Sequence, residues 1–253
     1  MQKKIYLVLI LVFEVLLLIA GCAKKPSDTP KIINDGINTV ESLYDIIDPI
    51  PIYIEENGEY VPFLVISTDY NDGVLLLRKE VLPTPMQYND YWSAYEGSTI
   101  DSYLNEGYIE ALTDDNLKVK DTEIIVTAPE SIGVCGDATN TIVRGVFLLS
   151  ITELGYDDSL GTTHEGEALE FFSNLSNRNT TLNGKPSSWW TRSAETYHGS
   201  AVHAICLNGG LGNGNASDLN GIRPAFCISK GTTIEQRQDL IPGESIYIIA
   251  SNQ

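Results

Sequence analysis

The sequence is poor in the residues that build metal centres and redox sites. It has three histidines and four cysteines in 253 residues, and no two cysteines show the Cys-x-x-Cys spacing of a zinc ligand pair. It also lacks phosphate loops, dinucleotide fingerprints and a Gly-x-Ser-x-Gly nucleophile elbow. These absences argue against a structural zinc site and against the common nucleotide-dependent and serine-hydrolase chemistries. We therefore predict neither a metal ion nor an organic cofactor.

Basic side chains are scarce as well. The 16 Lys and Arg residues face 34 Asp and Glu residues, so the formal net charge is −18 at pH 7. Nucleic acids and anionic surfaces bind clustered Lys and Arg, so the composition argues against a nucleic-acid partner. Residues 69–73 resemble a calcium loop faintly, but the segment is one residue too short and lacks the terminal Glu. We expect a turn there, and no other feature of the sequence supports calcium as a ligand.

Only the N-terminus carries a long apolar run. Lys3 and Lys4 precede residues 5–19, which are apolar except for Glu14, and Ala-Gly-Cys ends the segment at Cys22. A basic start, an apolar stretch of about 15 residues and small residues predict a secretory signal. The stretch is shorter than the roughly 20 residues of a transmembrane helix.

The small residues directly before Cys22 resemble the bacterial lipobox. The resemblance implies cleavage before this cysteine and a diacylglyceryl group on its sulfur, which would hold a soluble domain on a membrane. An ordinary signal peptide with an incidental cysteine is the alternative. We expect a signal peptide over 1–21, a tether over 22–31, and a lipid-anchored chain on the extracytoplasmic face of a bacterial cell membrane.

Hydrophobic periodicity predicts helices and hairpins in one chain. Apolar residues four and three positions apart predict a helical prefix over residues 32–48 and further helices over 98–112 and 167–175. Asn57-Gly58 and Asp72-Gly73 predict two hairpin turns. Helices and hairpins without a β-α-β rhythm indicate the α+β class with antiparallel sheet, two to three short helices and extensive loops.

Capping boxes mark two of the expected helix starts. Ser98 with Asp101 precedes one helix, and Ser150 with Glu153 opens another short helix. After the tether and the prefix, residues 49–253 read as one domain, because no repeat or low-complexity segment divides them.

Two strings of Trp and Arg stand about thirty residues apart: Trp-Trp-Thr-Arg-Ser from Trp189, and Gly-Ile-Arg-Pro-Ala-Phe from Gly221. Neighbouring residues of a strand face opposite sides, so the adjacent tryptophans should point to opposite faces. Pro224 cannot donate to a ladder, which predicts an edge or a bulge. Burying an arginine is costly unless it is paired, so we expect Arg192 and Arg223 to meet carboxylates or backbone carbonyls and to fasten the strands. A clamp for a substrate carboxylate is the alternative.

Together these strings resemble a bacterial domain family of unknown function, whose members carry Trp-Trp-x-Arg-Ser followed by Gly-Ile/Val-Arg-Pro-Ala. Segments 75–78, 98–105 and 146–153 resemble the same family, so the resemblance covers roughly residues 50–235. The family is similar in turn to the C-type-lectin-like fold of the formylglycine-generating enzymes, or sulfatase-modifying factors. The resemblance implies an irregular C-type-lectin-like domain. Those enzymes need a closely spaced, copper-binding cysteine pair, which is missing here.

The cysteines beyond the lipobox are Cys135, Cys206 and Cys227, and an odd number outside the cell leaves one thiol free or paired with another molecule. The last two fall on expected strands near the two strings. They could form a disulfide across a sheet or be two small buried apolar residues, and the sequence leaves both open. It also leaves the redox state of the thiols open.

The best candidate for a binding site is the Gly/Asn run from residue 207 to 220. Its short amide and carboxylate side chains suit hydroxyl-rich ligands such as sugars, especially beside an exposed Trp190, and loops on a rigid scaffold commonly bind ligands. The alternative is that Gly and Asn only make hairpin turns. The candidate ligand-binding residues of the run are Asn208, Asn213, Asn215, Asp218 and Asn220.

We therefore expect a surface-anchored, non-enzymatic domain that binds a glycan, a peptide or a protein. The alternatives are an enzyme derived from the formylglycine-generating scaffold and a structural component of an envelope complex. A cleft that holds Cys206, Cys227 and a histidine would favour the enzyme. An exposed ring of Trp190 or of a tyrosine beside the Asn-rich run would favour binding. The sequence does not identify the ligand or the oligomeric state.

Overall fold

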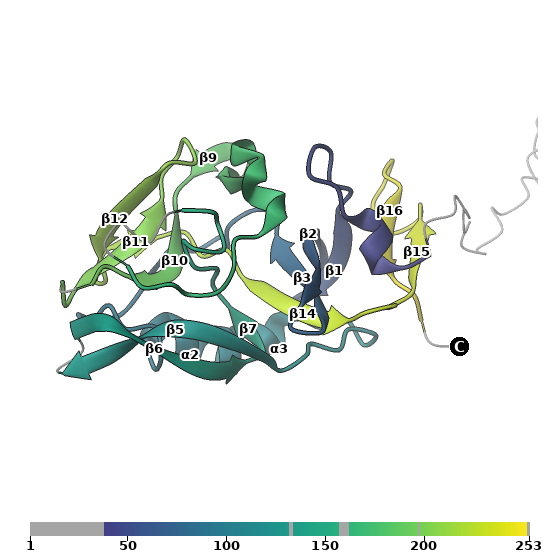
Figure 1. The fold of residues 1–253 in the computed structure, drawn as a ribbon. Helices are drawn as coiled ribbons and strands as arrows, with labels where there is room; N and C mark the ends of the chain where they lie inside the picture. Colours follow the sequence, from purple (N-terminus) through teal and green to yellow (C-terminus); the bar gives the residue numbers. More distant parts are fainter. Residues whose placement is uncertain (1–37, 132–133, 157–161, 197, 252–253) are drawn as a thin grey trace, which may run out of the picture. The chain divides into compact units, whose positions relative to one another are not determined.

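The two hairpins that the sequence predicts are present, and they form the centre of a seven-stranded sheet (Figure 1). The computed structural model describes residues 38–131, 134–156, 162–196 and 198–251. The strand order is β15-β16-β1-β2-β3-β14-β7, and only β1 and β16 run parallel, so the sheet is mixed. The strands are β1 Ile52–Glu56, β2 Glu59–Tyr70, β3 Gly73–Arg78, β7 Val146–Phe147, β14 Ala225–Ser229, β15 Ile234–Arg237 and β16 Ile246–Ile249.

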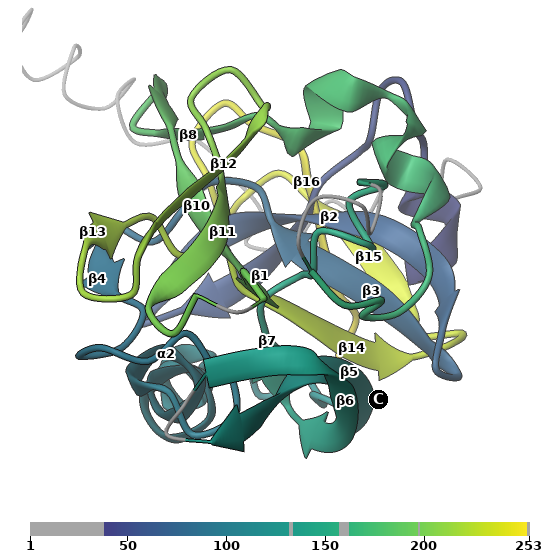
Figure 2. The ribbon, with the colours of Figure 1, turned by 60° about the vertical axis from the view of Figure 1, so that its left-hand side comes forward.

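A smaller sheet carries the Trp-Arg string. It consists of β10, β11 and β12, with β11 in the middle, and the β5–β6 hairpin lies below it in the view of Figure 2. Two further pairs of strands, β4–β13 and β8–β9, form separate two-stranded sheets. The bounds are β4 Met86–Gln87, β5 Thr122–Ser131, β6 Val134–Arg144, β8 Thr180–Leu182, β9 Lys185–Ser187, β10 Trp189–Ala194, β11 Ala201–Ile205, β12 Leu211–Asn215 and β13 Leu219–Asn220.

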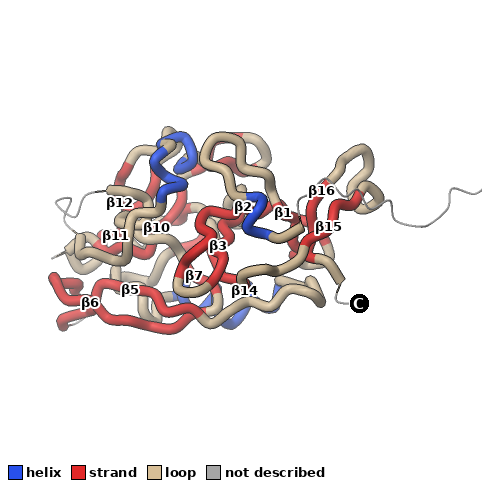
Figure 3. The backbone as a smooth tube through the Cα atoms, turned by 45° about the vertical axis from the view of Figure 1, so that its right-hand side comes forward, coloured by secondary structure: helices blue, strands red, loops and turns tan. Residues whose placement is uncertain are grey.

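Helices are few (Figure 3). Across the described residues one continuous helical segment of 13 residues occurs, and it is α-helical at both ends and π-helical in its middle. None of the helices that the structure describes is long and apolar enough to cross a membrane. The helical elements are η2 Val40–Leu43, α2 Thr99–Ser102, η3 Tyr103–Tyr108, α3 Ile109–Ala111, η5 Glu170–Ser173 and η6 Leu175–Arg178.

The α+β prediction, with its irregular lectin-like domain of several helices, is therefore wrong. Strands account for 43% of the structure and helices for 12%. The second capping box forms, since Ser150 N–H donates to the Glu153 carboxylate at 2.9 Å, but Gly155 at φ +78° ends the helix after one turn. The helix expected over 167–175 is interrupted because Asn174 adopts an extended conformation between η5 and η6.

The structure describes only part of the N-terminal region for which the sequence makes predictions. The signal peptide, Cys22 and the tether lie outside the described residues. The helical prefix is described from residue 38 on, where it contains the four-residue 3-10 turn η2. Val40 and Leu43 of this turn are buried in the main core, so the segment packs on the domain through its apolar side chains.

Turn chemistry sets the two central hairpins. Asn57 and Gly58 both have positive φ, 52° and 83°, which is the type I′ geometry expected from their sequence. The second hairpin is also confirmed, but its centre is Asn71-Asp72, with φ of 46° and 61°, one residue earlier than predicted. Tyr70 therefore pairs with Gly73, which begins β3 instead of completing the turn.

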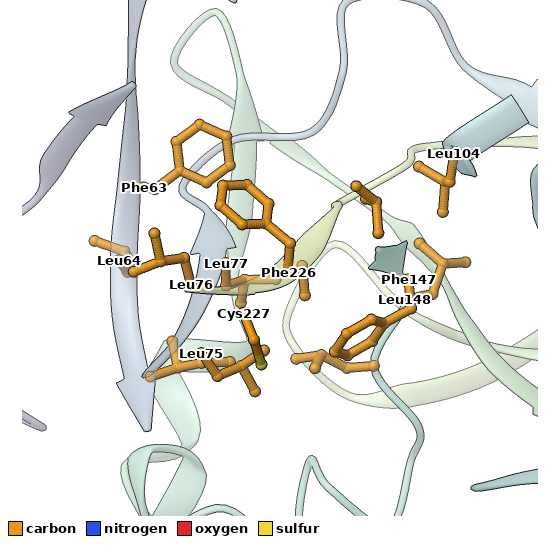
Figure 4. Packing of buried hydrophobic residues seen from close by; sticks show 14 of the residues in the cluster. Phe63, Leu64, Leu75, Leu76, Leu77, Leu104, Phe147, Leu148, Phe226 and Cys227 are labelled. Carbon is orange, nitrogen blue, oxygen red and sulfur yellow. The ribbon is translucent and has the colours of Figure 1, made fainter. Parts of the chain in front are cut away.

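The main core lies around the pairing of β3 with β14 (Figure 4). Phe226 of β14 lies opposite Leu76 of β3, and its ring is 5.3 Å from that of Phe63 on β2. Contrary to the expected edge position, Pro224 lies directly before β14, which runs between β3 and β7 in the sheet, and no ladder N–H is required there. Its carbonyl still accepts a hydrogen bond from the Arg78 N–H at 2.9 Å.

The β5–β6 hairpin has one edge bound by side chains and one edge open to solvent. On β5, the Ile125 carbonyl accepts from Arg192 Nε at 2.9 Å, and the Thr127 N–H donates to Glu165 Oε1 at 2.6 Å. These groups point away from β6. In an antiparallel ladder, the backbone groups of two directly opposite residues either point toward each other or both point away from each other. Because those of Ile125 point away from β6, those of Thr141, opposite Ile125, point away from β5, and Thr141 is exposed.

This alternation predicts a difference between two proline substitutions. Asn140→Pro removes the N–H that bonds to β5, and we expect it to lower the free energy of unfolding by about 3 kcal/mol or more. Thr141→Pro removes a solvent-facing N–H, and we expect a loss of less than about 1 kcal/mol. Urea denaturation measures both, with Asn140→Ala as the control for the lost side chain. Equal losses for the two prolines would contradict the alternation, and a larger loss for Thr141→Pro would indicate the opposite register.

Candidate functional site

The Trp-Arg string forms β10, and all six of its residues are buried. Trp189 is 0% and Trp190 1% exposed. The Trp189 indole N–H donates to the Arg178 carbonyl at 3.0 Å, and that of Trp190 donates to the Met86 carbonyl at 3.2 Å. Each indole thus satisfies its one polar group internally. Trp190 is covered and does not offer a surface to a ligand.

Arg192 forms the strongest buried contact of the string. Its Nη1 and Nη2 donate to the two carboxylate oxygens of Glu153 at 2.7 and 2.8 Å, and both side chains are 0% exposed. Nη1 also donates to the Leu148 carbonyl at 2.9 Å, in addition to the bond from Nε to β5. Glu153 is the carboxylate of the second capping box, so one side chain caps a turn and neutralises a buried arginine.

A second buried carboxylate, Glu165, lies beside this pair. Its Oε1 accepts from the Thr127 N–H and, at 2.7 Å, from the Thr127 hydroxyl, and its Oε2 accepts from the Ser193 hydroxyl. Its backbone carbonyl accepts from Arg192 Nη2 at 3.1 Å. Burial raises the pKa of Glu165, and the charge of Arg192 and the hydrogen bonds from Ser193 and Thr127 oppose this shift.

Tyr70 connects this network to a surface hollow. Its hydroxyl donates to Glu153 Oε1, and burial together with that carboxylate raises its pKa. The ring also lines a cavity of about 420 Å³ between the end of β2, strand β5 and residues 164–170. In the described part of the chain no group of three or more His, Cys, Asp or Glu side chains is placed to hold a metal ion. The hydrogen bonds of the network connect β2, β5, β10 and the turn after β7. The acidic residues that line the cavity are Asp69, Glu123, Glu167 and Glu170.

The Arg of the second string binds carbonyls instead of a carboxylate. Arg223 Nε donates to the Arg78 carbonyl at 2.9 Å and Nη1 to the Asn177 carbonyl at 3.3 Å. The guanidinium carbon lies 5.3 Å from the centre of the Trp189 ring, within the range of a cation–π contact. The carbonyl of Gly221 accepts from the Trp190 N–H at 2.9 Å, so the two strings contact each other directly.

The Gly/Asn run is mostly ordered structure. It contains strand β12 and two flanking turns, and several of its polar side chains have local partners. Asn213 Nδ2 donates to Glu195 at 2.8 Å, and Asp218 Oδ2 accepts from the Asn215 N–H at 3.0 Å. The remaining candidates accept backbone or hydroxyl hydrogen bonds close by, namely Asn208 from Gly210 at 3.1 Å and Asn220 from Ser188 at 2.6 Å and Gly221 at 2.9 Å.

Two glycines of this region are required by close packing. A Cβ atom on Gly214 would lie 2.9 Å from the Trp190 ring, and one on Gly221 would lie 2.4 Å from the Ser188 carbonyl. The glycines therefore let β12 and the second string approach β10. The side chains of Asn208, Asn213, Asn215 and Asp218 are nevertheless exposed, so the turns around β12 keep polar groups at the surface.

An aromatic pair that the sequence patterns did not predict lies beside this run, with Tyr91 exposed and Trp92 half-buried. Tyr91 is 58% exposed, and its ring stands edge-on to that of Trp92, with centroids 4.6 Å apart and planes at 87°. Their loop is tied to the run by the Asn89 N–H, which donates to the Ala216 carbonyl at 3.0 Å, and by Gln87 Nε2, which donates to the Ser217 carbonyl at 2.7 Å. The signal in the sequence was the pair of adjacent aromatics after Asn-Asp in a loop.

The cysteines do not form the disulfide that the sequence left open. Cys206 is a free, exposed thiol after β11, and Cys227 is a free, buried thiol on β14 of the other sheet. Burial raises the pKa of Cys227 to about 11, which makes it a poor nucleophile. The side chain of Cys135 lies outside the described residues. The structure thus does not bring Cys206 and Cys227 together in a cleft.

A family described as "Domain of unknown function (DUF6273)" matches residues 71–230. The match spans more than half of the chain, so the chain belongs to this family. No curated protein and no solved structure matches the chain. The resemblance to an uncharacterised domain family is confirmed, whereas no link to the lectin-like or formylglycine-generating scaffold is shown.

The Arg192–Glu153 pair generates a stability prediction. Glu153→Gln leaves a fully buried guanidinium without its charged partner, and we expect the free energy of unfolding to fall by about 3–5 kcal/mol. The double variant Glu153→Gln/Arg192→Met removes both charges and should recover part of that loss. Urea denaturation measures all variants, with Glu110→Gln on the exposed helix surface as the control. A loss equal to that of the control would mean that the pair contributes nothing.

Glu165 generates a prediction about pH. Its pKa is raised above the usual 4.5 in the folded protein, so the folded state binds the proton more tightly than the unfolded chain does. The resulting stabilisation is fully present below the unfolded pKa and is lost as the pH rises through the folded value. We expect wild type to lose stability relative to Glu165→Gln over that interval. Denaturation from pH 4 upward tests this, and a difference between wild type and Glu165→Gln that does not change with pH would contradict it.

Proposed function

We propose that this chain is a lipid-anchored surface protein whose domain binds glycans. The observation that carries the proposal is the exposed Tyr91 ring, held by backbone hydrogen bonds beside the turn that follows β12. We call this surface the aromatic–amide patch, and it consists of Tyr91, Trp92, Asn215, Ser217 and Asp218.

The chemistry of the patch suits a sugar better than a purely apolar ligand. A pyranose presents C–H groups on its faces and hydroxyls around its rim. An exposed aromatic ring accepts the C–H face, and short amide and carboxylate side chains pair with the rim hydroxyls. Asn215 and Asp218 supply these polar groups from the turn whose Ala216 and Ser217 carbonyls accept hydrogen bonds from the aromatic loop, and both are exposed. The patch therefore offers both kinds of contact on neighbouring loops.

The patch is also held in place before any ligand arrives. Besides the bonds to Ala216 and Ser217, the Ser93 N–H donates to the Gly199 carbonyl at 3.0 Å, which fixes the end of the aromatic loop to the turn before β11. Asn89 Nδ2 donates to the Trp92 carbonyl at 3.2 Å and closes the loop on itself. A preorganised surface loses less conformational entropy on binding, which supports recognition of weakly binding ligands such as glycans.

The anchor is supported by the sequence alone. The apolar run and the lipobox-like residues before Cys22 indicate a lipidated N-terminus, and the following tether would place the domain outside the membrane. A glycan-binding domain on a cell surface would meet polysaccharides of the same envelope or of other cells. The separate positions of Cys206 and Cys227 give no support to the thiol-dependent enzyme.

A glycan array probed with the full chain in detergent tests the proposal. We expect hits that Tyr91→Ala weakens at least tenfold, a loss of about 1.4 kcal/mol of binding free energy. Tyr91→Phe should retain most of the affinity, because the ring face remains. Leu175→Ala is the matched control, since Leu175 is 62% exposed on η6 outside the patch.

Two outcomes would contradict the proposal. One is an array without any hit. The other is a hit, or a captured peptide or protein, whose affinity is the same for wild type, Tyr91→Ala and Leu175→Ala.

A further inference from the structure

Arg223 borders a small hollow that is positively charged in an otherwise acidic protein. The hollow has a volume of about 220 Å³ and lies between the end of β3, the η6–β8 segment and the second string. Arg223 and Lys79 both line it, and no Asp or Glu does. The other lining residues are Leu64, Ser176, Asn177, Asn179, Thr180 and Thr181.

The guanidinium of Arg223 is buried without a counter-charge. The residue is 1% exposed, and its hydrogen bonds use Nε and Nη1 on two backbone carbonyls. Within the described residues, Nη2 makes no hydrogen bond and no carboxylate forms an ion pair with Arg223. By contrast, Arg78 pairs with Glu56 at 3.0 Å and Arg192 pairs with Glu153.

Burial without compensation is unfavourable for Arg223. It lowers the pKa of the guanidinium to about 9, whereas the paired Arg192 shows a raised pKa. A buried cation is normally offset by an anion or neutralised by losing its proton. The unpaired guanidinium beside the hollow therefore suits a bound anion, because no carboxylate of the described residues pairs with it.

Lys79 adds a second cation at the mouth of the hollow. Its side chain is exposed, and its Nζ makes no ion pair within the part of the chain that the structure describes. The nearest acidic side chain in sequence, Glu80, does not line the hollow, because the Thr181 hydroxyl and the backbone around residues 183–184 hold it. Thr181, the hydrogen-bond partner of Glu80, lines the hollow, so Glu80 lies beside the hollow and not in its lining.

We propose that the hollow beside Arg223 and Lys79 binds a small oxyanion, a carboxylate or a phosphate group, with Arg223 Nη2 and Lys79 Nζ as donors. Charge-assisted hydrogen bonds to such a group are about twice as strong as neutral ones. The volume suits a single anionic group more than a whole ligand of drug size, for which cavities usually start at about 300 Å³. This site uses none of the residues of the aromatic–amide patch and stands independently of the glycan proposal.

Anion-dependent stability of the full chain in detergent tests the proposal. A ligand that binds only the folded state stabilises it by RT ln(1 + [L]/Kd), so the unfolding temperature rises with the concentration of the ligand. We expect inorganic phosphate or acetate to raise it above that in chloride of equal ionic strength, and the arm that responds identifies a phosphate or a carboxylate. Lys79→Gln should weaken the apparent affinity for the responding anion at least tenfold. Lys118→Gln is the matched control, because Lys118 is also exposed but lines a different cavity.

A second measurement separates specific binding from a general salt effect. Titration of the responding anion, followed by amide NMR, should shift the signals of Asn179 and Thr180 with the same apparent affinity as the stability curve. Arg223→Lys retains the positive charge on a compact ammonium group in place of the planar guanidinium. We expect this variant to fold and to show a smaller rise of the unfolding temperature with the anion. The proposal is overturned if neither anion acts beyond chloride, or if Lys79→Gln and Lys118→Gln weaken the response equally.

Discussion

The buried ion pair between Arg192 and Glu153 is the constraint on which the rest of the structure depends. One guanidinium contacts three separate segments: the turn after β7 through Glu153 and Leu148, strand β5 through Ile125, and the segment 162–169 through the Glu165 carbonyl. Some of the acceptors have a second donor, since the Glu165 carbonyl also accepts from the Ser150 hydroxyl at 2.7 Å and Glu153 from the Ser150 N–H at 2.9 Å. Removing the arginine would nevertheless take a donor from three backbone carbonyls and the charged partner from one buried carboxylate at once.

The same network explains how two sheets coexist without a long helix between them. The outer edge of β5 is not paired with another strand, and an open buried edge would leave its backbone groups unsatisfied. Arg192 and Glu165 take the place of that strand, because one donates to the Ile125 carbonyl and the other accepts from the Thr127 N–H. Two charged side chains thus act as a substitute for a neighbouring strand, and the strings that contain them position the surface loops.

Local patterns predicted the features that depend on neighbouring residues. The first hairpin follows from the Asn57-Gly58 pair, and the second from a turn at Asn71-Asp72, one residue earlier than predicted. The Ser150–Glu153 capping box follows from the spacing of its two residues. The partner of Arg192 lies 39 residues away, and no local pattern identifies it. The burial of Trp190 depends likewise on Gly214, a residue on another strand. The helix predicted over 98–112 is present as the continuous segment from Thr99 to Ala111. The helices predicted at 150–153 and over 167–175 failed for a local reason, since Gly155 and Asn174 interrupt them. Periodicity weighs apolar positions without counting such breaks.

The two arginines of the strings show why residue type alone does not define a site. Both are buried, both belong to strings that resemble the same family, and both were expected to fasten strands. Arg192 has a carboxylate partner with ideal bidentate geometry, so its charge is used within the fold. Arg223 fastens strands through two carbonyls but keeps an uncompensated charge beside a hollow. A structural role and a binding role are therefore compatible in one residue, and the distribution of charge around the guanidinium distinguishes them.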